Sequence, residues 1–235
     1  MPNASKMTEN RLETVQRRIK NTCDATNRDS AGVRLLAVSK LHPGNAVRAL
    51  YAQGQRAFGE NYVQEGVDKV AELADLADIE WHLIGPLQSN KTREVAENFS
   101  WVHTVDREKI ALRLHDQRPP RLAPLNVCIQ VNVSGEASKS GCPLKEAVAL
   151  ALHAAKWPRL NVRGFMGMPE PDIGEEATRA QFRALAALIP AAAQQGLALD
   201  TLSMGMSDDM DWAIAEGSTM VRVGTALFGA RPVKA

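Results

Sequence analysis

The sequence predicts an α/β fold in which a single (β/α)8 TIM barrel is preceded by an extra N-terminal helix. Apolar or β-branched runs alternate with helical segments along the chain, and there are eight such runs. Strands and helices in this order form parallel sheets with right-handed crossovers. Most of the runs are continuously apolar, as in parallel strands that helices cover. Eight such units in 235 residues suit a closed barrel.

The expected elements follow one another in a regular order. The extra helix covers residues 9–27, and its apolar stripe at helical spacing consists of Leu12, Val15, Ile19 and Cys23. The eight strand-like runs are 33–39, 56–60, 79–85, 101–105, 125–133, 161–168, 201–207 and 220–229. The helical segments open at Pro43 and continue over 62–76, 89–98, 106–116, 143–156, 174–195 and 208–216. A doubly wound sheet, the competing architecture, would need a glycine-rich loop after the first strand, and SKLHPG is not one.

Composition and charge exclude several classes of function. The net formal charge of +1 gives no electrostatic basis for a nucleic-acid or acidic-membrane partner. No apolar run approaches the ~20 residues that span a bilayer, and the N-terminus lacks the apolar core of a signal peptide. We therefore expect a cytoplasmic protein. Cys23, Cys128 and Cys142 are widely spaced and form no CxxC pair, which predicts free, partly buried thiols rather than disulfides or a zinc site.

A lysine, Lys40, ends the first apolar run. In a barrel the carboxyl ends of the strands converge on one mouth, so this lysine is a candidate site residue. Partial burial or a nearby cation would lower the pKa of its amine, which could then condense with an aldehyde to form an imine. The alternative is a strand-end lysine that reaches solvent.

A candidate phosphate site follows the last two strands. Ser207 precedes a helical segment expected from Asp208, so its hydroxyl and the first N–H groups of that helix could hold an anion. Gly224 and Thr225 at the end of the eighth strand could complete the site, because phosphate sites after strands seven and eight recur in this barrel. Taken singly, Ser207 is equally explained as a helix N-cap and Gly224 as a tight turn.

A lysine across the mouth from a phosphate site suggests a phosphorylated aldehyde, and pyridoxal 5′-phosphate is the commonest cofactor of that kind. Arg222 then acquires a specific role, since a guanidinium can only donate hydrogen bonds. It would meet an unprotonated ring nitrogen and leave the ring a weak electron acceptor. The alternative for Arg222 is an ion pair with a nearby acidic residue.

Ordered motifs between residues 33 and 229 carry a resemblance to a known family. They are LLAVSK, FGENYVQE, WHLIGPLQSNK, VHTVD, VNVSGEASKSG, GFMGM, LSMGMSDDMDWAI and VRVGTALFG. With these motifs the chain closely resembles the pyridoxal phosphate homeostasis protein family, which is similar to the N-terminal barrel of bacterial alanine racemase. The resemblance implies a single pyridoxal-phosphate-binding barrel domain over residues 1–235, with residues 1–30 as a helix packed on the barrel.

The resemblance also implies the residues of the site. The matching positions are Lys40 for the imine, Ser207, Gly224 and Thr225 for the phosphate, Arg222 for the ring nitrogen and Asn61 for the pocket wall. Met204 and Met206 are expected to wall the ring or the phosphate, or else to fill the core. Lys139, after the fifth strand, could accept the cofactor transiently or be a solvated loop lysine. His82 and His103 could touch the site, although we expect satisfied strand histidines.

Members of the family are regarded as carriers or regulators of the cofactor and of amino-acid and keto-acid balance, without established turnover. The resemblance thus implies a binding protein that holds pyridoxal 5′-phosphate as a lysine imine, with no catalytic residue and no metal. It also implies apoenzymes as recipients and, since the racemase's dimer-forming domain is missing, a monomer. The alternative is an amino-acid racemase, which needs a second base. Tyr51 falls in a helical segment away from the mouth, and Tyr62 opens a helix.

Overall fold

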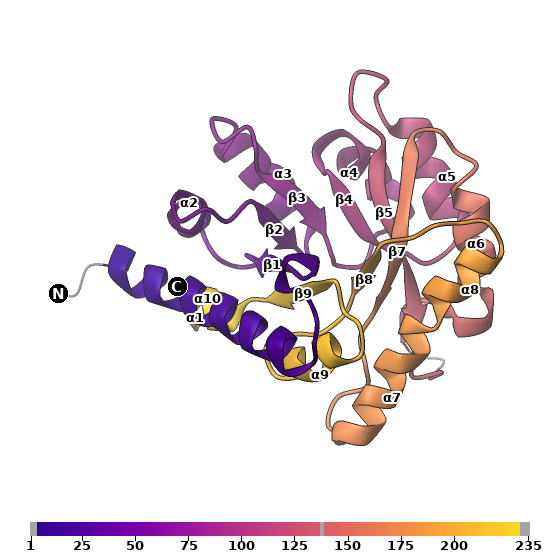
Figure 1. Ribbon diagram of the computed structural model, residues 1–235. Coiled ribbons are helices and arrows are strands. Elements are labelled where there is room, and N and C mark those ends of the chain that lie inside the picture. The colour runs from indigo at the N-terminus through magenta and orange to yellow at the C-terminus, as the bar shows by residue number, and fades with distance from the viewer. Residues whose placement is uncertain (1–3, 137–138, 231–235) are drawn as a thin grey trace.

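Eight parallel strands form a closed barrel that helices surround, which confirms the predicted fold class (Figure 1). The computed structural model describes residues 4–136 and 139–230. Residues 1–3 and 231–235 of the expected domain, and residues 137–138 of the GEASKSG motif, lie outside this description. The barrel strands are β1 (Arg34–Val38), β2 (Ala57–Glu60), β3 (Glu80–Leu83), β4 (Trp101–Val105), β5 (Leu125–Asn132), β7 (Leu160–Gly167), β8 (Thr201–Ser203) and β9 (Met220–Val223).

The strand order closes the barrel. Strands that follow one another along the chain pair in parallel, β4 pairs with β5, and β9 returns to pair with β1. In this last pair Ala37 lies opposite Val223. The register therefore sets the end of β1, which leads to Lys40, beside the end of β9, which leads to Gly224.

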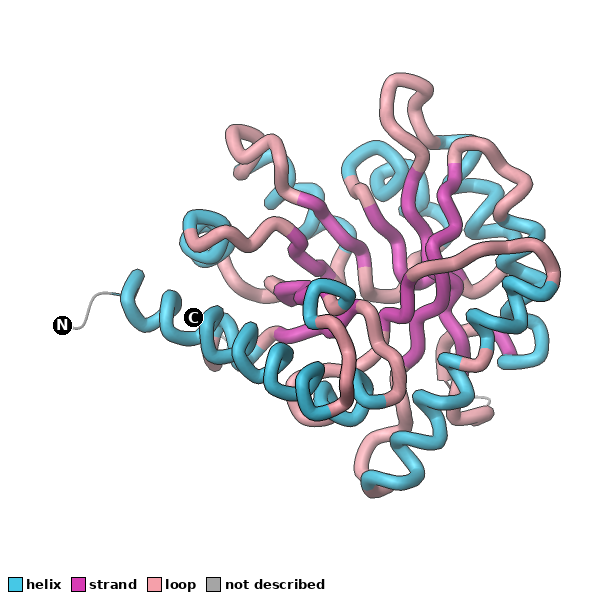
Figure 2. Tube along the Cα trace, viewed as in Figure 1, coloured by secondary structure: helices cyan, strands magenta, loops and turns pink. Residues whose placement is uncertain are grey.

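Helices form the outer layer around the strands (Figure 2). They are α1 (Ala4–Ala25), α2 (Gly44–Ala52), α3 (Val63–Glu72), α4 (Thr92–Asn98), α5 (Glu108–Gln117), α6 (Ala147–Ala154), α7 (Glu175–Ala186), α8 (Leu188–Gln194), α9 (Met210–Ala215) and α10 (Thr225–Phe228). Short 3-10 turns occur at η1 (Ser30–Gly32), η2 (Ser89–Lys91) and η3 (Leu144–Glu146). The helix expected over 174–195 divides into α7 and α8 at Ala187, because Pro190 has no N–H to donate to the carbonyl of Ala186.

A short strand that the sequence analysis did not predict, β6 (Cys142–Pro143), pairs with the end of β5. The approach is so close that a β-carbon at Gly141 would lie 2.6 Å from the backbone nitrogen of Asn132. Gly141 also has a φ of 116°, which an L side chain rarely adopts. Glycine at this position therefore permits the extra strand.

The N-terminal helix α1 packs against α2, α9 and α10 (Figure 1). The predicted apolar stripe faces the barrel, and its members are all buried: Leu12, Val15, Ile19 and Cys23. On α9, Asp211 accepts a hydrogen bond from Arg18 Nη2 at 2.9 Å. Apolar burial and this ion pair together hold α1 against α9 and the side of the barrel.

All three cysteines are free and buried, as predicted. Burial raises the pKa of the Cys128 and Cys142 thiols to about 12. Among residues 4–136 and 139–230, no group of three or more potential metal ligands comes together. In the same part of the chain, no helix combines the length and apolar character needed to cross a lipid bilayer.

Candidate functional site

A cavity of about 460 Å³ opens at the carboxyl ends of β1, β2, β3 and β9, where the sequence predicts the mouth of the barrel. Its volume lies within the range of small-molecule sites. Six of the seven expected cofactor residues line it, namely Lys40, Asn61, Ser207, Arg222, Gly224 and Thr225. The remaining wall consists of Val38, His42, Ile84, Met168, Met206 and Asp208.

The turn after β1 brings Lys40 to the cavity. The N–H of Ser39 donates to the carbonyl of Gly59 at 2.9 Å and so extends the pairing of β1 with β2 by one residue. Leu41 then adopts a left-handed φ of 63°, which bends the chain away from the strand direction. Lys40 lies between these two residues and is half-buried, with its side chain in the cavity wall.

Arg222 lies on β9 and is only 5 % exposed. Its Nη1 donates to the backbone carbonyl of Ser203 at 2.6 Å and to the Ser203 hydroxyl at 3.0 Å, and its Nη2 donates to the Gly167 carbonyl at 3.1 Å. Burial lowers the pKa of the guanidinium to about 10, so it remains charged at neutral pH. No ion pair joins Arg222 to an acidic residue in the part of the chain that the structure describes, although the negative charge of Asp209 acts on its pKa in the direction opposite to burial.

Ser207 lines the cavity after β8, the strand that pairs with β9. Its backbone carbonyl accepts a hydrogen bond from Arg18 Nη1 at 2.7 Å, so helix α1 fixes this part of the rim. The helix that we expected from Asp208 begins at Met210, because Asp209 accepts the backbone N–H of Met206 at 2.6 Å and closes a turn instead. Ser207 is therefore a loop residue at the cavity and not the N-cap of α9.

Gly224 and Thr225 complete the rim beside β1. A β-carbon at Gly224 would lie 3.3 Å from the carbonyl oxygen of Val38, so β9 and β1 approach closely here. Thr225 is exposed and begins α10, whose first N–H groups have no acceptor within the helix. The structure thus brings a hydroxyl and backbone N–H groups to the side of the cavity shared with Lys40.

Of the expected cofactor residues Asn61 and Met204, the first lines the cavity and the second does not. Asn61 lines the cavity, and its Oδ1 is buried without a hydrogen-bond partner among the described residues. A buried acceptor without a donor is costly, which favours a ligand that supplies the donor. Met204 is fully buried in the main core and does not line the cavity. Gly205, with a φ of 94°, redirects the chain, so that Met206 lines the cavity in its place.

Five lining residues were missed by the sequence analysis: Val38, His42, Ile84, Met168 and Asp208. His42 is 8 % exposed and stacks on Phe228 with 4.8 Å between ring centroids. Because His42 follows Lys40 by two residues in the same strand-to-helix turn, its position in the sequence could have predicted that it lines the cavity. Met168, directly after β7, offered a similar signal because strand ends converge at the mouth. Asp208 had no such signal, since we placed it inside a helix.

Comparison with known proteins shows the family of this chain. The family model described as alanine racemase, N-terminal domain, matches residues 11–232. A Pseudomonas aeruginosa protein named pyridoxal phosphate homeostasis protein is 57 % identical over 220 residues, which are 94 % of each chain. A protein of the same name from Escherichia coli is 50 % identical over 222 residues, covering 94 % of this chain and 95 % of that one. This chain belongs to the pyridoxal phosphate homeostasis protein family.

Solved structures extend the comparison to the fold. PipY from Synechococcus elongatus, a structure described as without PLP, is 38 % identical with a TM-score of 0.84, covering 94 % of this chain and 99 % of that one. PipY with PLP bound is also 38 % identical, with a TM-score of 0.83 and coverage of 94 % and 100 %. An alanine racemase from Clostridium difficile is 13 % identical with a TM-score of 0.72, covering 93 % of this chain and 57 % of its own. That last likeness shows the fold alone.

In this member of the homeostasis protein family a second cavity, of about 440 Å³, adjoins the first. The two share four lining residues, Asn61, Ile84, Met168 and Met206. Lys139 lines the second cavity and is exposed, but it does not line the first. The structure therefore brings Lys139 to the neighbourhood of the mouth without placing it beside Lys40.

His82 and His103 lie inside the barrel and do not line the cavity. His82 Nδ1 is 2.9 Å from His103 Nε2, and His103 Nδ1 is 2.8 Å from the Ser203 hydroxyl. Burial, together with the positive charges of Arg222 and Arg34, lowers the pKa of His103 to about 3. Burial also holds the pKa of His82 well below its usual value. Both histidines are thus neutral strand residues; His103 is satisfied on both ring nitrogens, as expected, whereas His82 Nε2 is buried without a partner among the described residues, contrary to the expectation.

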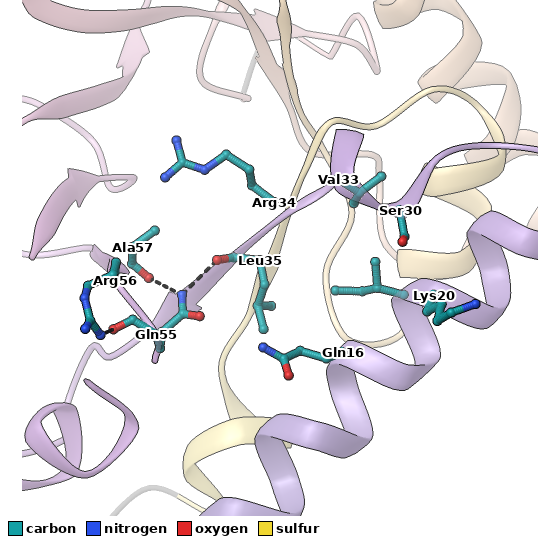
Figure 3. A pocket seen from close by; sticks show the side chains of 10 residues that line it. Gln16, Lys20, Ser30, Val33, Arg34, Leu35, Gln55, Arg56 and Ala57 are labelled. Carbon is teal, nitrogen blue, oxygen red and sulfur yellow. Dashed lines mark hydrogen bonds between the residues drawn. The ribbon is translucent and has the colours of Figure 1, made fainter. Parts of the chain in front are cut away.

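A separate cavity, of about 360 Å³, lies at the amino-terminal end of the barrel between α1 and the starts of β1 and β2 (Figure 3). Gln55 Nε2 closes part of it by donating to the carbonyls of Leu35 and Ala57 at 2.8 and 2.7 Å. Its cations each pair with a carboxylate at 2.6 to 2.8 Å; the pairs are Lys20–Asp24, Arg34–Glu80 and Arg56–Asp78. Because these lining cations are already paired with carboxylates, this cavity is a weaker candidate for a ligand-binding site than the cavity at the mouth of the barrel.

Proposed function

We propose that this chain binds pyridoxal 5′-phosphate in the mouth cavity as an imine of Lys40. In this form it takes part in intracellular vitamin B6 and amino-acid and keto-acid homeostasis, without catalytic turnover. The observation that carries the proposal is that one cavity is lined by Lys40 and by the rim residues Ser207, Gly224 and Thr225. The 38 % identical PipY, described with PLP bound, supports the same ligand.

The residues present fit this cofactor. The Lys40 amine would condense with the aldehyde, whose oxygen leaves as water, while the Ser207 and Thr225 hydroxyls and nearby backbone N–H groups would hold the phosphate. The orphaned Asn61 Oδ1 would accept a hydrogen bond from a donor on the ligand. Methionines 168 and 206 offer apolar surface to a planar ring.

Arg222 supports a binding role rather than a catalytic one. Three hydrogen bonds to Ser203 and Gly167 fix its guanidinium at the cavity wall. A bound pyridine ring withdraws electrons strongly when its nitrogen is protonated, and a guanidinium cannot hold a proton there. Arg222 would instead donate to that nitrogen. The ring would then be a weak electron acceptor.

An amino-acid racemase is the second candidate. Neither tyrosine supplies its second base, because neither lines the cavity: Tyr51 donates to Asp78 on the outside of the barrel, and Tyr62 is 56 % exposed. We expect the purified protein loaded with cofactor to form no D-isomer from L-alanine, L-serine or L-valine above a protein-free control. Steady accumulation of a D-amino acid on chiral chromatography would favour the racemase instead.

We further propose that residues 1–235 act as one domain, with residues 1–30 packed on the barrel, and that the protein is a cytoplasmic monomer that yields its cofactor to apoenzymes. The contacts of α1 with α2, α9 and α10, and the hydrogen bond from Arg18 to Ser207, support the first part. Light scattering coupled to gel filtration measures the oligomeric state. Recovery of activity by an added apoenzyme measures cofactor transfer.

Borohydride reduction followed by peptide mass spectrometry tests the central proposal. The wild-type protein incubated with pyridoxal 5′-phosphate should carry the reduced adduct on the peptide that contains Lys40. Lys40→Ala should lose this adduct and bind the cofactor at least about tenfold more weakly, whereas Lys91→Ala, at a lysine outside the cavity, should match the wild type. An adduct confined to another wild-type peptide would overturn the assignment.

A further inference from the structure

An ionic cluster with two buried members, Glu60 and Lys69, and one half-buried member, Glu65, contacts the turn that carries Lys40. It consists of Glu60 at the end of β2 and of Glu65 and Lys69 on α3, and we call these three residues the clamp. Lys69 Nζ donates to Glu60 Oε1 at 2.7 Å, to Glu65 Oε1 at 2.8 Å and to the backbone carbonyl of Ser39 at 2.7 Å. An ammonium has three N–H donors, so each one has an acceptor.

The clamp is costly to bury. Lys69 is 5 % exposed and Glu60 is fully buried, and Glu60 Oε2 has no partner among the described residues. Burial raises the pKa of Glu60 although the Lys69 ammonium opposes the shift. Replacing a buried ion pair by apolar residues is often neutral or stabilising, so stability alone is a weak reason for its presence. A role in positioning accounts for it better.

The clamp binds the backbone on both sides of Lys40. Before Lys40, Ser39 accepts the Lys69 ammonium on its carbonyl and donates its hydroxyl to Glu60 Oε1 at 2.6 Å. After Lys40, the Leu41 N–H donates to Glu65 Oε1 at 2.5 Å. Both immediate neighbours of Lys40 in the chain, Ser39 and Leu41, are therefore held by the clamp.

The anchored turn is not one that the chain would adopt by itself. Leu41 has a φ of 63°, in the left-handed region, where a β-carbon lies too close to the following carbonyl oxygen and the conformation is unfavourable. The charge-assisted hydrogen bond from Leu41 to Glu65 is of a strength that offsets this cost. Without that bond the backbone of the turn would relax, and Lys40, which lies between Ser39 and Leu41, would change its position.

We propose that Lys69, Glu65 and Glu60 are positioning residues that hold the Lys40 amine toward the cavity for covalent binding of an aldehyde ligand. This inference rests on the proposed function. Glu65 and Lys69 are four residues apart and share one face of α3, so a single helix face supplies the clamp. Asn61, which lines the cavity, directly follows Glu60 of the clamp in the chain, so the clamp is joined to the cavity wall through the backbone.

Two ligands separate positioning of Lys40 from general damage to the site. Pyridoxal 5′-phosphate has the aldehyde, whereas pyridoxine 5′-phosphate has an alcohol there and cannot bond to the amine. Glu65→Ala removes the acceptor of the Leu41 N–H and should weaken binding of the aldehyde about tenfold to a hundredfold in titration calorimetry. Binding of the alcohol should stay within about threefold. Glu65→Gln keeps an oxygen acceptor and should restore aldehyde binding.

The first-turn acid of α4 provides a matched control. Glu94 pairs with Lys91 at 2.8 Å and makes no contact with the Lys40 turn, so Glu94→Ala should leave both affinities unchanged. Equal losses for both ligands in Glu65→Ala, or no loss for either, would overturn the inference. The same conclusion would follow if Glu65→Gln behaved like Glu65→Ala.

A measurement without ligand keeps the inference distinct from the proposed function. In the ligand-free protein, Glu65→Ala should speed amide hydrogen exchange at Leu41 about tenfold or more, while Glu65→Gln and Glu94→Ala should not. Unchanged exchange at Leu41 would contradict the clamp even in a protein that binds the cofactor. Failure of the wild type to bind either ligand would instead refute the proposed function, and exchange at Leu41 would still decide whether the clamp holds the turn.

Discussion

Arg222 Nη1 donates to the hydroxyl of Ser203 at 3.0 Å. Because a guanidinium only donates, Ser203 accepts here and can direct its own proton to His103 Nδ1, 2.8 Å away. His103 then carries its proton on Nε2 and donates it to His82 Nδ1. The resulting chain of donors runs from the cavity wall into the barrel and ends at His82 Nε2, which has no partner among the described residues. This direction leaves fewer unpaired groups than the reverse.

Ser203→Ala should remove one of the three hydrogen bonds of Arg222 and leave His103 Nδ1 without a donor. Arg222 would keep its bonds to the carbonyls of Ser203 and Gly167, so the guanidinium stays near its place. We expect the free energy of unfolding to fall by about 1 to 3 kcal/mol, the usual cost of an unsatisfied buried group. Urea titration measures this change, with Ser100→Ala as the control at a partly exposed serine. A variant as stable as the wild type would contradict the hydrogen-bond chain.

Stability should decrease on mild acidification because of the same histidines. Their folded-state pKa values lie below the ordinary value of 6.5, at about 3 for His103 and well below 6.5 for His82. Below pH 6.5 the two histidines therefore bind protons in the unfolded chain but stay neutral in the folded protein. Their contribution is complete above about pH 6.5 and is lost as the pH falls toward 3.

Urea unfolding between pH 7.5 and 5 measures this dependence. Each buried histidine should contribute about 1 kcal/mol of lost stability per pH unit below 6.5. His153→Gln, at a histidine whose side chain is 45 % exposed, should show the same slope as the wild type. A flat profile over this interval would mean that the two histidines do not stay neutral in the folded protein.

The barrel and most of the site could be predicted from the sequence because both depend on local order. Apolar runs and helical segments fix the strand sequence, and strand ends in a barrel must meet at one mouth. Lys40 and Gly224 therefore come together once β1 is known to pair with β9. The family resemblance added which chemistry to expect there, and six of the seven expected residues line the cavity.

The remaining features depend on backbone turns and on long-range contacts. Met204 and Met206 are alike in sequence, and only the positive φ of Gly205 sends one to the core and the other to the cavity. Lys69 carries the signature of a solvated helix lysine paired with Glu65 four residues away. No local sequence pattern predicts its contact with the Ser39 carbonyl, which lies thirty residues earlier in the chain.

Arg222→Glu tests whether the guanidinium keeps the proposed ligand unreactive. A carboxylate can hold a proton at the ring nitrogen, and a protonated ring withdraws electrons from a bound amino acid more strongly. In deuterated water we expect exchange at the α-carbon of an added amino acid to rise at least about tenfold per bound cofactor. Arg222→Gln, which can still donate a hydrogen bond but holds no proton, should remain at the wild-type rate. Equal exchange in both variants at matched occupancy would contradict this account.

Gly85→Ala should damage the cavity through the backbone. A β-carbon at Gly85 would lie 1.9 Å from the carbonyl oxygen of Asn61, and a backbone atom cannot yield as a flexible side chain does. We expect a loss of about 1 to 3 kcal/mol in unfolding free energy together with weaker cofactor binding. Gly32→Ala, where nothing lies within 4 Å of the new β-carbon, should change stability by less than about 0.5 kcal/mol. If both variants unfold at the same urea concentration, Gly85 does not set the position of Asn61.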